Sequence, residues 1–216
     1  MEIILENIGR RFNQEWIFRS LNYRFERGQA YAILGANGSG KSTLLQVLAG
    51  SLSASEGSLT YQSGETKIES DDFYEHISIA APYLDLIEEF SLAEMIDFHF
   101  QFKDFLPGFD SKEIIRILDL KKVENKSIRY FSSGMKQRCK LALAVFTNTP
   151  VLLLDEPTAN LDKQGIEWYQ HLVANYTKER LLIICSNQEE EYKCCTQQLQ
   201  ISDYKNFDNL VGENSN

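Results

Sequence analysis

The segment "GANGSGKS", from Gly35 to Ser42, fits the pattern G-x-x-x-x-G-K-[ST]. Glycines permit the positive φ angles that turn successive backbone N–H groups toward one anion. The apolar run before the segment predicts a strand, and the leucines after it predict a helix whose N-terminus favours negative charge. The pattern therefore predicts a phosphate-binding loop, in which Lys41 reaches the β- and γ-phosphates of a nucleotide and Ser42 binds Mg²⁺.

The segment "VLLLDE", residues 151–156, is an apolar strand pattern that ends in two acids. Asp155, at the end of the predicted strand, would hold Mg²⁺, in the simplest arrangement through a water molecule. Glu156 would orient and polarise an attacking water as a general base. An acid pair after an apolar run is common by itself. Downstream of a phosphate-binding loop, it predicts nucleotide hydrolysis.

Strands and helices alternate around these two motifs. Buried strands are predicted at 30–34, 151–155 and 180–186, and helices at 43–50 and 166–179. Such alternation indicates a mainly parallel sheet. Further strands are expected at 2–8, within 22–26 and 56–70, and at 196–202. The last residues, 212–216, are expected to be frayed.

The middle of the chain has a helical pattern instead. Apolar residues in 91–102 recur with helical spacing, and Ser91 with Glu94 forms a capping box. Segments 111–120 and 132–149 also predict helices. We therefore expect a helical subdomain over 86–146, inserted into a nucleotide-binding core and β-subdomain formed by 1–85 and 147–216.

Composition limits the partners of the chain. The net charge is −9, which argues against nonspecific binding of nucleic acid, so no nucleic-acid partner is expected. No apolar run reaches the roughly 20 residues that a membrane helix needs. The N-terminal segment lacks the pattern of a secretory signal, so a cytoplasmic location is expected.

The motifs, together with "FSSGMKQR" (131–138) and "DEPTANLD" (155–162), resemble the ATP-binding subunit of ABC transporters. Ser132 and Gly134 match the family signature, whereas Ser133 stands where glycine is usual and Met135 where glutamine is usual. This version is similar to that of exporter ATPases paired with ABC-2-type membrane subunits. Asp162 corresponds to the end of the D-loop.

The resemblance covers almost the whole chain, so it implies a single ATP-binding domain over 1–216. The implied fold is α/β: a P-loop NTPase with a RecA-like core and a mainly parallel sheet, an N-terminal antiparallel β-subdomain and an inserted helical subdomain. Phe12 would stack on adenine, with Trp16 as a rival. The predicted ATP-binding residues are Phe12, Gly35, Ala36, Asn37, Gly38, Ser39, Gly40, Lys41, Ser42 and Thr43.

The family also implies partners. Two identical or similar cassettes would pair head to tail, with ATP and Mg²⁺ between them. Ser132, Ser133 and Gly134 would then contact the ATP bound to the partner subunit. A separate integral-membrane permease would hold the cassette at the cytoplasmic face of the cell membrane. That permease would also choose the transported substrate.

Two positions depart from the family pattern. The glutamine that usually contacts Mg²⁺ and the attacking water is replaced, with Pro82 or Tyr83 at its place. The switch histidine is replaced by Asn187, which donates a hydrogen bond but carries no positive charge. We therefore expect normal ATP binding and slower hydrolysis, with Glu156 as the base.

Three functions compete at this point. The first is an ATPase subunit that powers transport through a separate permease. The second is a cassette with impaired hydrolysis that acts as a regulatory or asymmetric partner, which the two altered positions favour. The third is a soluble ABC-type ATPase that works on nucleic acid or ribosomes, which the acidic composition opposes.

Overall fold

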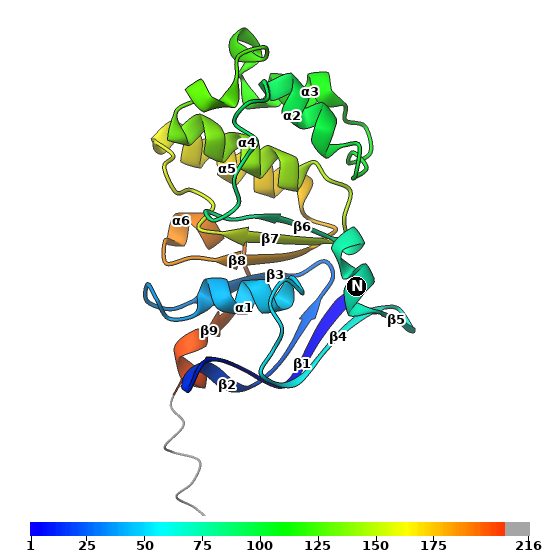
Figure 1. Cartoon of the computed structure of the whole chain (residues 1–216), viewed down its shortest axis with the longest axis vertical. Helices are drawn as coiled ribbons and strands as arrows, with labels where there is room; N and C mark the ends of the chain where they lie inside the picture. The colour runs from blue at the N-terminus through cyan, green and yellow to red at the C-terminus, as the bar shows by residue number, and fades with distance from the viewer. Residues whose placement is uncertain (206–216) are drawn as a thin grey trace, which may run out of the picture.

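The computed structural model of the chain describes residues 1–205, and its polypeptide forms two β-sheets separated by a helix (Figure 1). One sheet is antiparallel, and every strand pair of the other is parallel. The predicted fold class is thus confirmed. The segment 212–216 lies outside the described residues.

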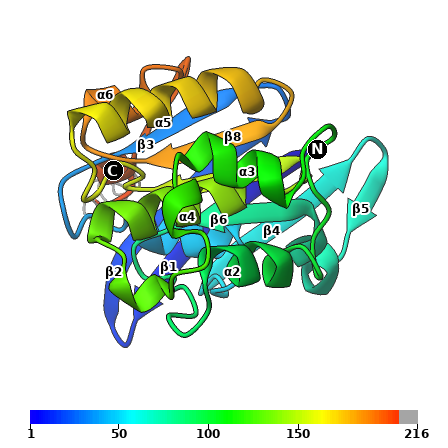
Figure 2. The same cartoon turned by 90° about the horizontal axis from the view of Figure 1, so that it is seen from above.

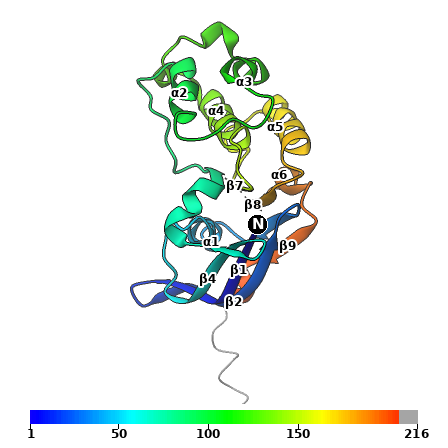
Figure 3. The ribbon, with the colours of Figure 1, turned by 90° about the vertical axis from the view of Figure 1, so that its right-hand side faces the viewer.

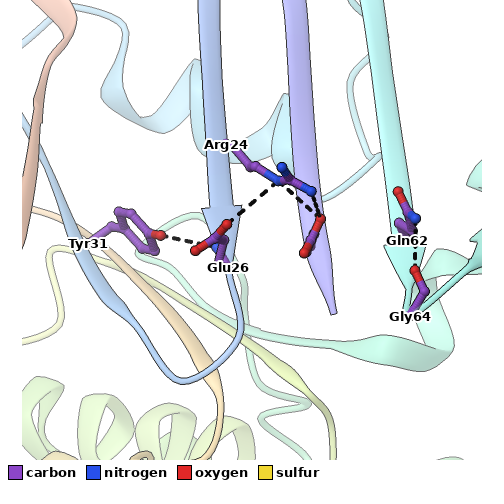
Figure 4. Close-up of polar contacts among 6 residues, drawn as sticks. Arg24, Glu26, Tyr31, Gln62 and Gly64 are labelled. Atoms are coloured by element: carbon purple, nitrogen blue, oxygen red, sulfur yellow. Dashed lines mark hydrogen bonds and ion pairs between the residues drawn. The ribbon is translucent and has the colours of Figure 1, made fainter.

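The antiparallel sheet comes from the first third of the chain. Its strands, in spatial order, are β2 (Glu15–Glu26), β1 (Glu2–Phe12), β4 (Glu56–Ser63) and β5 (Thr66–Ile68). Arg24 of β2 makes an ion pair with Glu2 of β1 and lies 3.7 Å from the Glu26 carboxylate (Figure 4). These exposed pairs add little stability, so the sheet is held mainly by its buried side chains.

The parallel sheet contains two strands that are buried along their whole length, β7 (Val151–Asp155) and β8 (Leu181–Cys185). The spatial order of the sheet is β6 (Ile77–Ala80), β7, β8, β3 (Ala30–Leu34) and β9 (Gln197–Gln200). Residues of β7 alternate between two hydrophobic cores: Val151 and Leu153 belong to one, and Leu152 and Leu154 to the other. A strand buried on both faces reads as a continuous apolar run, which is why β7 and β8 were predictable.

Helices cover both faces of the parallel sheet. Helix α1 (Lys41–Leu48) lies between the two sheets, where its leucines share one core with both (Figure 3). The opposite face is covered by α4 and α5, with α2 and α3 packed above (Figure 2). These helices are α2 (Leu92–His99), α3 (Ser111–Leu118), α4 (Ser133–Val145) and α5 (Lys163–Tyr176). A short helix, α6 (Glu189–Tyr192), packs on α5.

Four 3₁₀ turns complete the described elements. They are η1 (Ser70–His76), η2 (Lys121–Val123), η3 (Ile128–Tyr130) and η4 (Ile201–Tyr204). The predicted capping box of Ser91 and Glu94 is present at the start of α2. The helix predicted over 132–149 ends at Val145, because Thr147 instead forms an isolated bridge with Phe105. Local periodicity carries no sign of that long-range contact.

His99, at the end of α2, makes folding stability depend on pH. Its Nε2 lies 2.8 Å from the Thr147 hydroxyl oxygen, and burial lowers the pKa of His99 to about 4, with Lys103 contributing. In the unfolded chain His99 binds a proton near pH 6.5, whereas in the folded chain it stays neutral until about pH 4. The unfolding free energy therefore falls as the pH drops from about 6.5 toward 4.

When the pH is lowered from 7.5 to 5, the unfolding free energy of both proteins should fall. We expect this fall to be smaller in His99→Gln than in the wild type by about 1–2 kcal/mol, a figure reduced for the partial exposure of the ring. Denaturant titrations at the two pH values measure this difference. The control is His171→Gln, on the exposed face of α5. Equal losses in wild type and His99→Gln would show that His99 does not control acid stability.

Candidate functional site

The predicted phosphate-binding loop connects β3 to α1. Gly35, Gly38 and Gly40 have φ angles of 151°, 72° and 105°, which side chains disfavour. A Cβ atom on Gly40 would lie 2.4 Å from the Cγ2 atom of Ile17 on β2. The loop therefore needs glycine at these places for its backbone path and for its contact with the antiparallel sheet.

Donors converge on the loop. The ammonium of Lys41 donates to the carbonyls of Gly35 at 2.7 Å and Ala36 at 3.2 Å. The hydroxyl oxygen of Ser39 is buried and has no hydrogen-bond partner in the described part of the chain. The residue before α1, Gly40, offers no side-chain cap to the first backbone N–H groups of the helix, which Ser42 and Thr43 continue. These groups fit an anion, because buried donors otherwise lose their hydrogen bonds.

Asp155 lies where β7 ends, close to the phosphate loop. Asp155 is only 1% exposed, and its Oδ1 atom has no hydrogen-bond partner among residues 1–205. Burial raises the pKa of Asp155, whereas a hydrogen bond from Ser42 and the charge of Lys41 oppose the rise. A hydroxyl and an unpartnered carboxylate oxygen are ligands that Mg²⁺ prefers, so Ser42 and Asp155 fit that ion.

Glu156 follows Asp155 in a left-handed backbone conformation, with φ of 43°. Its backbone N–H donates to the Cys185 carbonyl at 2.9 Å, which continues the pairing of β7 with β8. The side chain is exposed. Strained backbone of this kind is retained where the surrounding structure requires it, commonly at functional sites. The turn leaves a carboxylate free beside the buried Asp155.

Asn187 lies beside the phosphate loop. Its side-chain amide donates to the Oδ1 atom of Asn37 at 2.7 Å, across 150 positions of sequence. The loop after β8 and the loop after β3 meet because these strands are parallel neighbours. Asn187 is thus hydrogen-bonded to the predicted phosphate-binding loop, and its side chain is uncharged.

Tyr83, rather than Pro82, faces this group of residues. The Tyr83 hydroxyl hydrogen-bonds with Gln46 of α1, and burial together with the nearby Asp155 charge raises the pKa of Tyr83 to about 12. The hydroxyl therefore stays protonated at neutral pH and can donate. The backbone carbonyl of Pro82 instead accepts a hydrogen bond from Lys140 at 3.3 Å.

The predicted signature and D-loop residues form a second group. Ser132 caps α4 by accepting from the Met135 N–H, and Asp162 caps α5 by accepting from the Gly165 N–H at 2.8 Å. The two helix starts share a cavity of about 330 Å³. Its lining comprises Ser132, Ser133, Gly134, Met135, Arg138, Asn160, Leu161, Asp162 and Gly165.

Phe12 ends β1 at the hairpin with β2, and 46% of its surface is exposed. The Arg10 guanidinium lies 4.5 Å from the centre of its ring. Trp16 is more enclosed, because Arg19 lies 4.6 Å from its ring centre and Gly9 lies directly beneath it. Of the two rings, Phe12 is the more exposed.

Two residues with contacts in this region had no sequence signal. Gln137 of α4 is buried and donates to the Pro157 carbonyl at 2.8 Å, so the signature helix is tied to the loop after Glu156. Glu191 is 2% exposed and bonds to Thr158. Glu191 belongs to an acidic run, "QEEE", whose residue types do not distinguish a buried carboxylate from solvated ones.

Known proteins resemble this chain over the region that contains these motifs. A family model described as "ABC transporter" matches residues 18–159. The chain is 34% identical over 179 residues to the cytochrome c biogenesis ATP-binding export protein CcmA of Mesorhizobium japonicum, covering 82% of this chain and 86% of that one. It is 28% identical over 185 residues to the ABC transporter ATP-binding protein YybJ of Bacillus subtilis, covering 86% and 84%.

Solved structures share the fold. An ABC transporter ATP-binding protein from Pyrococcus furiosus has a TM-score of 0.79 at 18% identity, covering 95% of this chain and 100% of that one. The dimeric ABC transporter cassette MJ0796 has a TM-score of 0.76 at 20% identity, covering 92% and 93%. Both contain the P-loop NTPase fold.

Within the described residues, no helix is long and apolar enough to cross a membrane. The family model covers more than half of the chain and includes the phosphate loop, the signature segment and the acid pair. The chain therefore belongs to the ABC transporter family as an ATP-binding cassette, and it is an ATPase.

Proposed function

We propose that this ATPase powers transport through a separate membrane-spanning permease, and that it works as a dimer of cassettes. In this proposal it lies at the cytoplasmic face of the membrane through the permease. The export activity named for the relative CcmA supports the role.

The observation that carries the proposal is the separation of the site residues into two groups. The phosphate loop precedes α1 on one face of the parallel sheet, whereas the signature segment begins α4 on the other face (Figure 1). The signature segment lines its cavity with Asp162 and Asn160, not with the phosphate loop. One chain thus supplies two half-sites, and a second cassette would complete each.

Each group of residues has a role in this proposal. The backbone of the phosphate loop and Lys41 bind the phosphates, and Phe12 stacks on the base. Ser42 and Asp155 would hold Mg²⁺, which neutralises charge on the phosphates when bound. Glu156 accepts a proton from the attacking water and orients it.

A groove between the sheet edge and the helices suits the permease. It has a volume of about 720 Å³ and is lined by Tyr74, Tyr83, Leu84, Met95, Lys103 and Lys140, among others. Tyr74 is 62% exposed, and burial lowers the pKa values of Lys103 and Lys140. Two partly desolvated cations among apolar side chains fit an amphipathic permease segment that carries carboxylates.

Tyr83 would connect the two regions, because it lines the groove and its hydroxyl lies near Asp155. We expect Tyr83→Phe to lower kcat for ATP hydrolysis about fivefold, since one hydrogen bond contributes about 1 kcal/mol. Affinity for ATP should stay unchanged. The matched control is Tyr74→Phe, because the Tyr74 hydroxyl donates to the exposed carboxylate of Glu75. Equal rates for Tyr83→Phe and wild type would exclude a role for the hydroxyl.

One observation favours a second function, that of a regulatory or asymmetric half with impaired hydrolysis. Asn187 contacts Asn37 through a neutral amide and cannot carry the charge of an imidazolium. The exposed Glu156 carboxylate opposes this alternative, because it retains the group needed as a base.

Steady-state ATP hydrolysis over a range of protein concentrations tests the proposal. Specific activity that rises with concentration supports a dimeric ATPase, and further stimulation by a co-expressed permease supports the transport role. A rate independent of concentration would contradict the dimer. ATP binding with a rate no faster than that of Glu156→Gln would favour the regulatory half.

A further inference from the structure

The two loops that carry Glu156 and Asn187 meet at one buried carboxylate. Glu191 belongs to α6 and is 2% exposed. Its Oε1 atom accepts from the backbone N–H of Thr158 at 2.7 Å and from the Thr158 hydroxyl at 2.5 Å. Its Oε2 atom accepts from the hydroxyl of Ser186. Each carboxylate oxygen thus holds a different loop.

The bonds of Ser186 extend this contact to Asn187. The Ser186 hydroxyl oxygen accepts from the Gln188 N–H at 2.8 Å. This bond closes the turn that contains Asn187, and Glu191 holds that turn through Ser186. On the other side, Thr158 is two positions after Glu156. A single side chain therefore fixes the place of the catalytic loop and of the loop that reaches Asn37.

The backbone of the helix that carries Glu191 is itself anchored. The Tyr169 hydroxyl donates to the Glu191 carbonyl at 2.8 Å, and Gln170 donates to the Glu190 carbonyl at 3.0 Å, so α5 anchors α6. No ion pair to Glu191 occurs among residues 1–205, so hydrogen bonds from neutral donors compensate for its burial. Burying a carboxylate costs free energy that an apolar side chain of similar size would not cost, so packing alone does not explain a glutamate at this position.

We propose that Glu191 is a positioning residue for ATP hydrolysis, which sets Glu156 and Asn187 relative to each other. We call its bonds to Thr158 and Ser186 the Glu191 bridge. The proposal rests on the ATPase activity of the family and adds a residue that acts through its bonds to Thr158 and Ser186. A loop displacement of about 1 Å costs a reaction as much as 10²-fold, so the bridge should affect turnover more than binding.

The first experiment compares Glu191→Ala with Glu190→Ala, which removes a neighbouring exposed acid from the same helix. We expect Glu191→Ala to lower kcat about 10–100-fold and to change the Kd of ATP less than about threefold. Glu190→Ala should match the wild type. Glu191→Gln should recover most of the rate, because its amide oxygen can face the Thr158 N–H while the Ser186 hydroxyl reverses to accept.

A second readout needs no nucleotide. Amide hydrogen exchange of the free full-length chain should be faster at Thr158 and Gln188 in Glu191→Ala, and unchanged in Glu190→Ala, because these two N–H groups depend on the bridge. If Glu191→Ala does not fold, Thr158→Val and Ser186→Ala each remove one hydroxyl arm. Each should then lower kcat about 3–10-fold.

The outcomes separate this proposal from the transport function. Wild-type kcat and wild-type exchange in a folded Glu191→Ala, or in both hydroxyl variants, would overturn the bridge. Equal losses of ATP affinity and turnover would also overturn it, since they indicate a merely structural role. Faster exchange at Thr158 and Gln188 alongside reduced turnover would support it, whether or not a permease stimulates the chain.

Discussion

Glu156→Gln is expected to lower the rate of ATP hydrolysis by about 10²–10⁴-fold, the usual contribution of acid–base catalysis. The amide keeps the shape of the side chain and removes its ability to accept a proton. Glu156 is exposed, and its carboxylate accepts no hydrogen bond from the residues that the structure describes. ATP binding and thermal stability should therefore stay as in the wild type.

Single-turnover hydrolysis with labelled ATP measures the loss, and equilibrium binding of ATP checks that the pocket is intact. Glu167→Gln, an exposed glutamate on α5, is the matched control and should hydrolyse ATP at the wild-type rate. A Glu156→Gln rate within about threefold of wild type would assign the base to another group.

Asp155→Asn is expected to change activity and stability in opposite directions. The carboxylate is buried, its Oδ1 atom lacks a partner, and burial raises its pKa, so its negative charge is unfavourable in the chain without nucleotide. Removing the charge should raise the unfolding free energy by about 1–2 kcal/mol. Hydrolysis should fall by at least about 10²-fold, because a ligand for Mg²⁺ is lost.

Thermal unfolding with and without Mg²⁺ and ATP measures both effects. In the wild type, the ligands should raise the Tm, because they bind only the folded state. In Asp155→Asn the Tm without ligands should be higher and the increase with ligands smaller. Asp71→Asn, at an exposed position of η1, is the control. A lower Tm for Asp155→Asn without ligands would contradict this, because it would show that the Asp155 carboxylate stabilises the folded chain.

Local signals were sufficient to predict the secondary-structure elements around the glycine loop. The glycine loop, the apolar strands β3, β7 and β8, and the helix after the loop each follow from a few neighbouring residues. The alternation of strands and helices then predicted the parallel sheet. These predictions agree with the structure because one short segment determines each feature, with little influence from distant side chains.

Contacts between distant segments could not be predicted in the same way. The sequence left Pro82 and Tyr83 as alternatives, and only the fold directs the Tyr83 hydroxyl toward Gln46. The contact of Asn187 with Asn37 joins two loops 150 positions apart. Glu191 lies in an acidic run that reads as surface, and its burial depends on where α5 holds α6.

The two carbonyl bonds of Lys41 bear on how a cycle of turnover can end. The ammonium is buried and donates to Gly35 and Ala36 at the edge of its own loop. When product phosphates leave, the two carbonyls can again accept hydrogen bonds from the Lys41 ammonium. The buried cation then keeps its acceptors after the phosphates have left. If Lys41 binds the phosphates as proposed, its own loop would compete with the nucleotide for the ammonium, and this competition would favour release of the product.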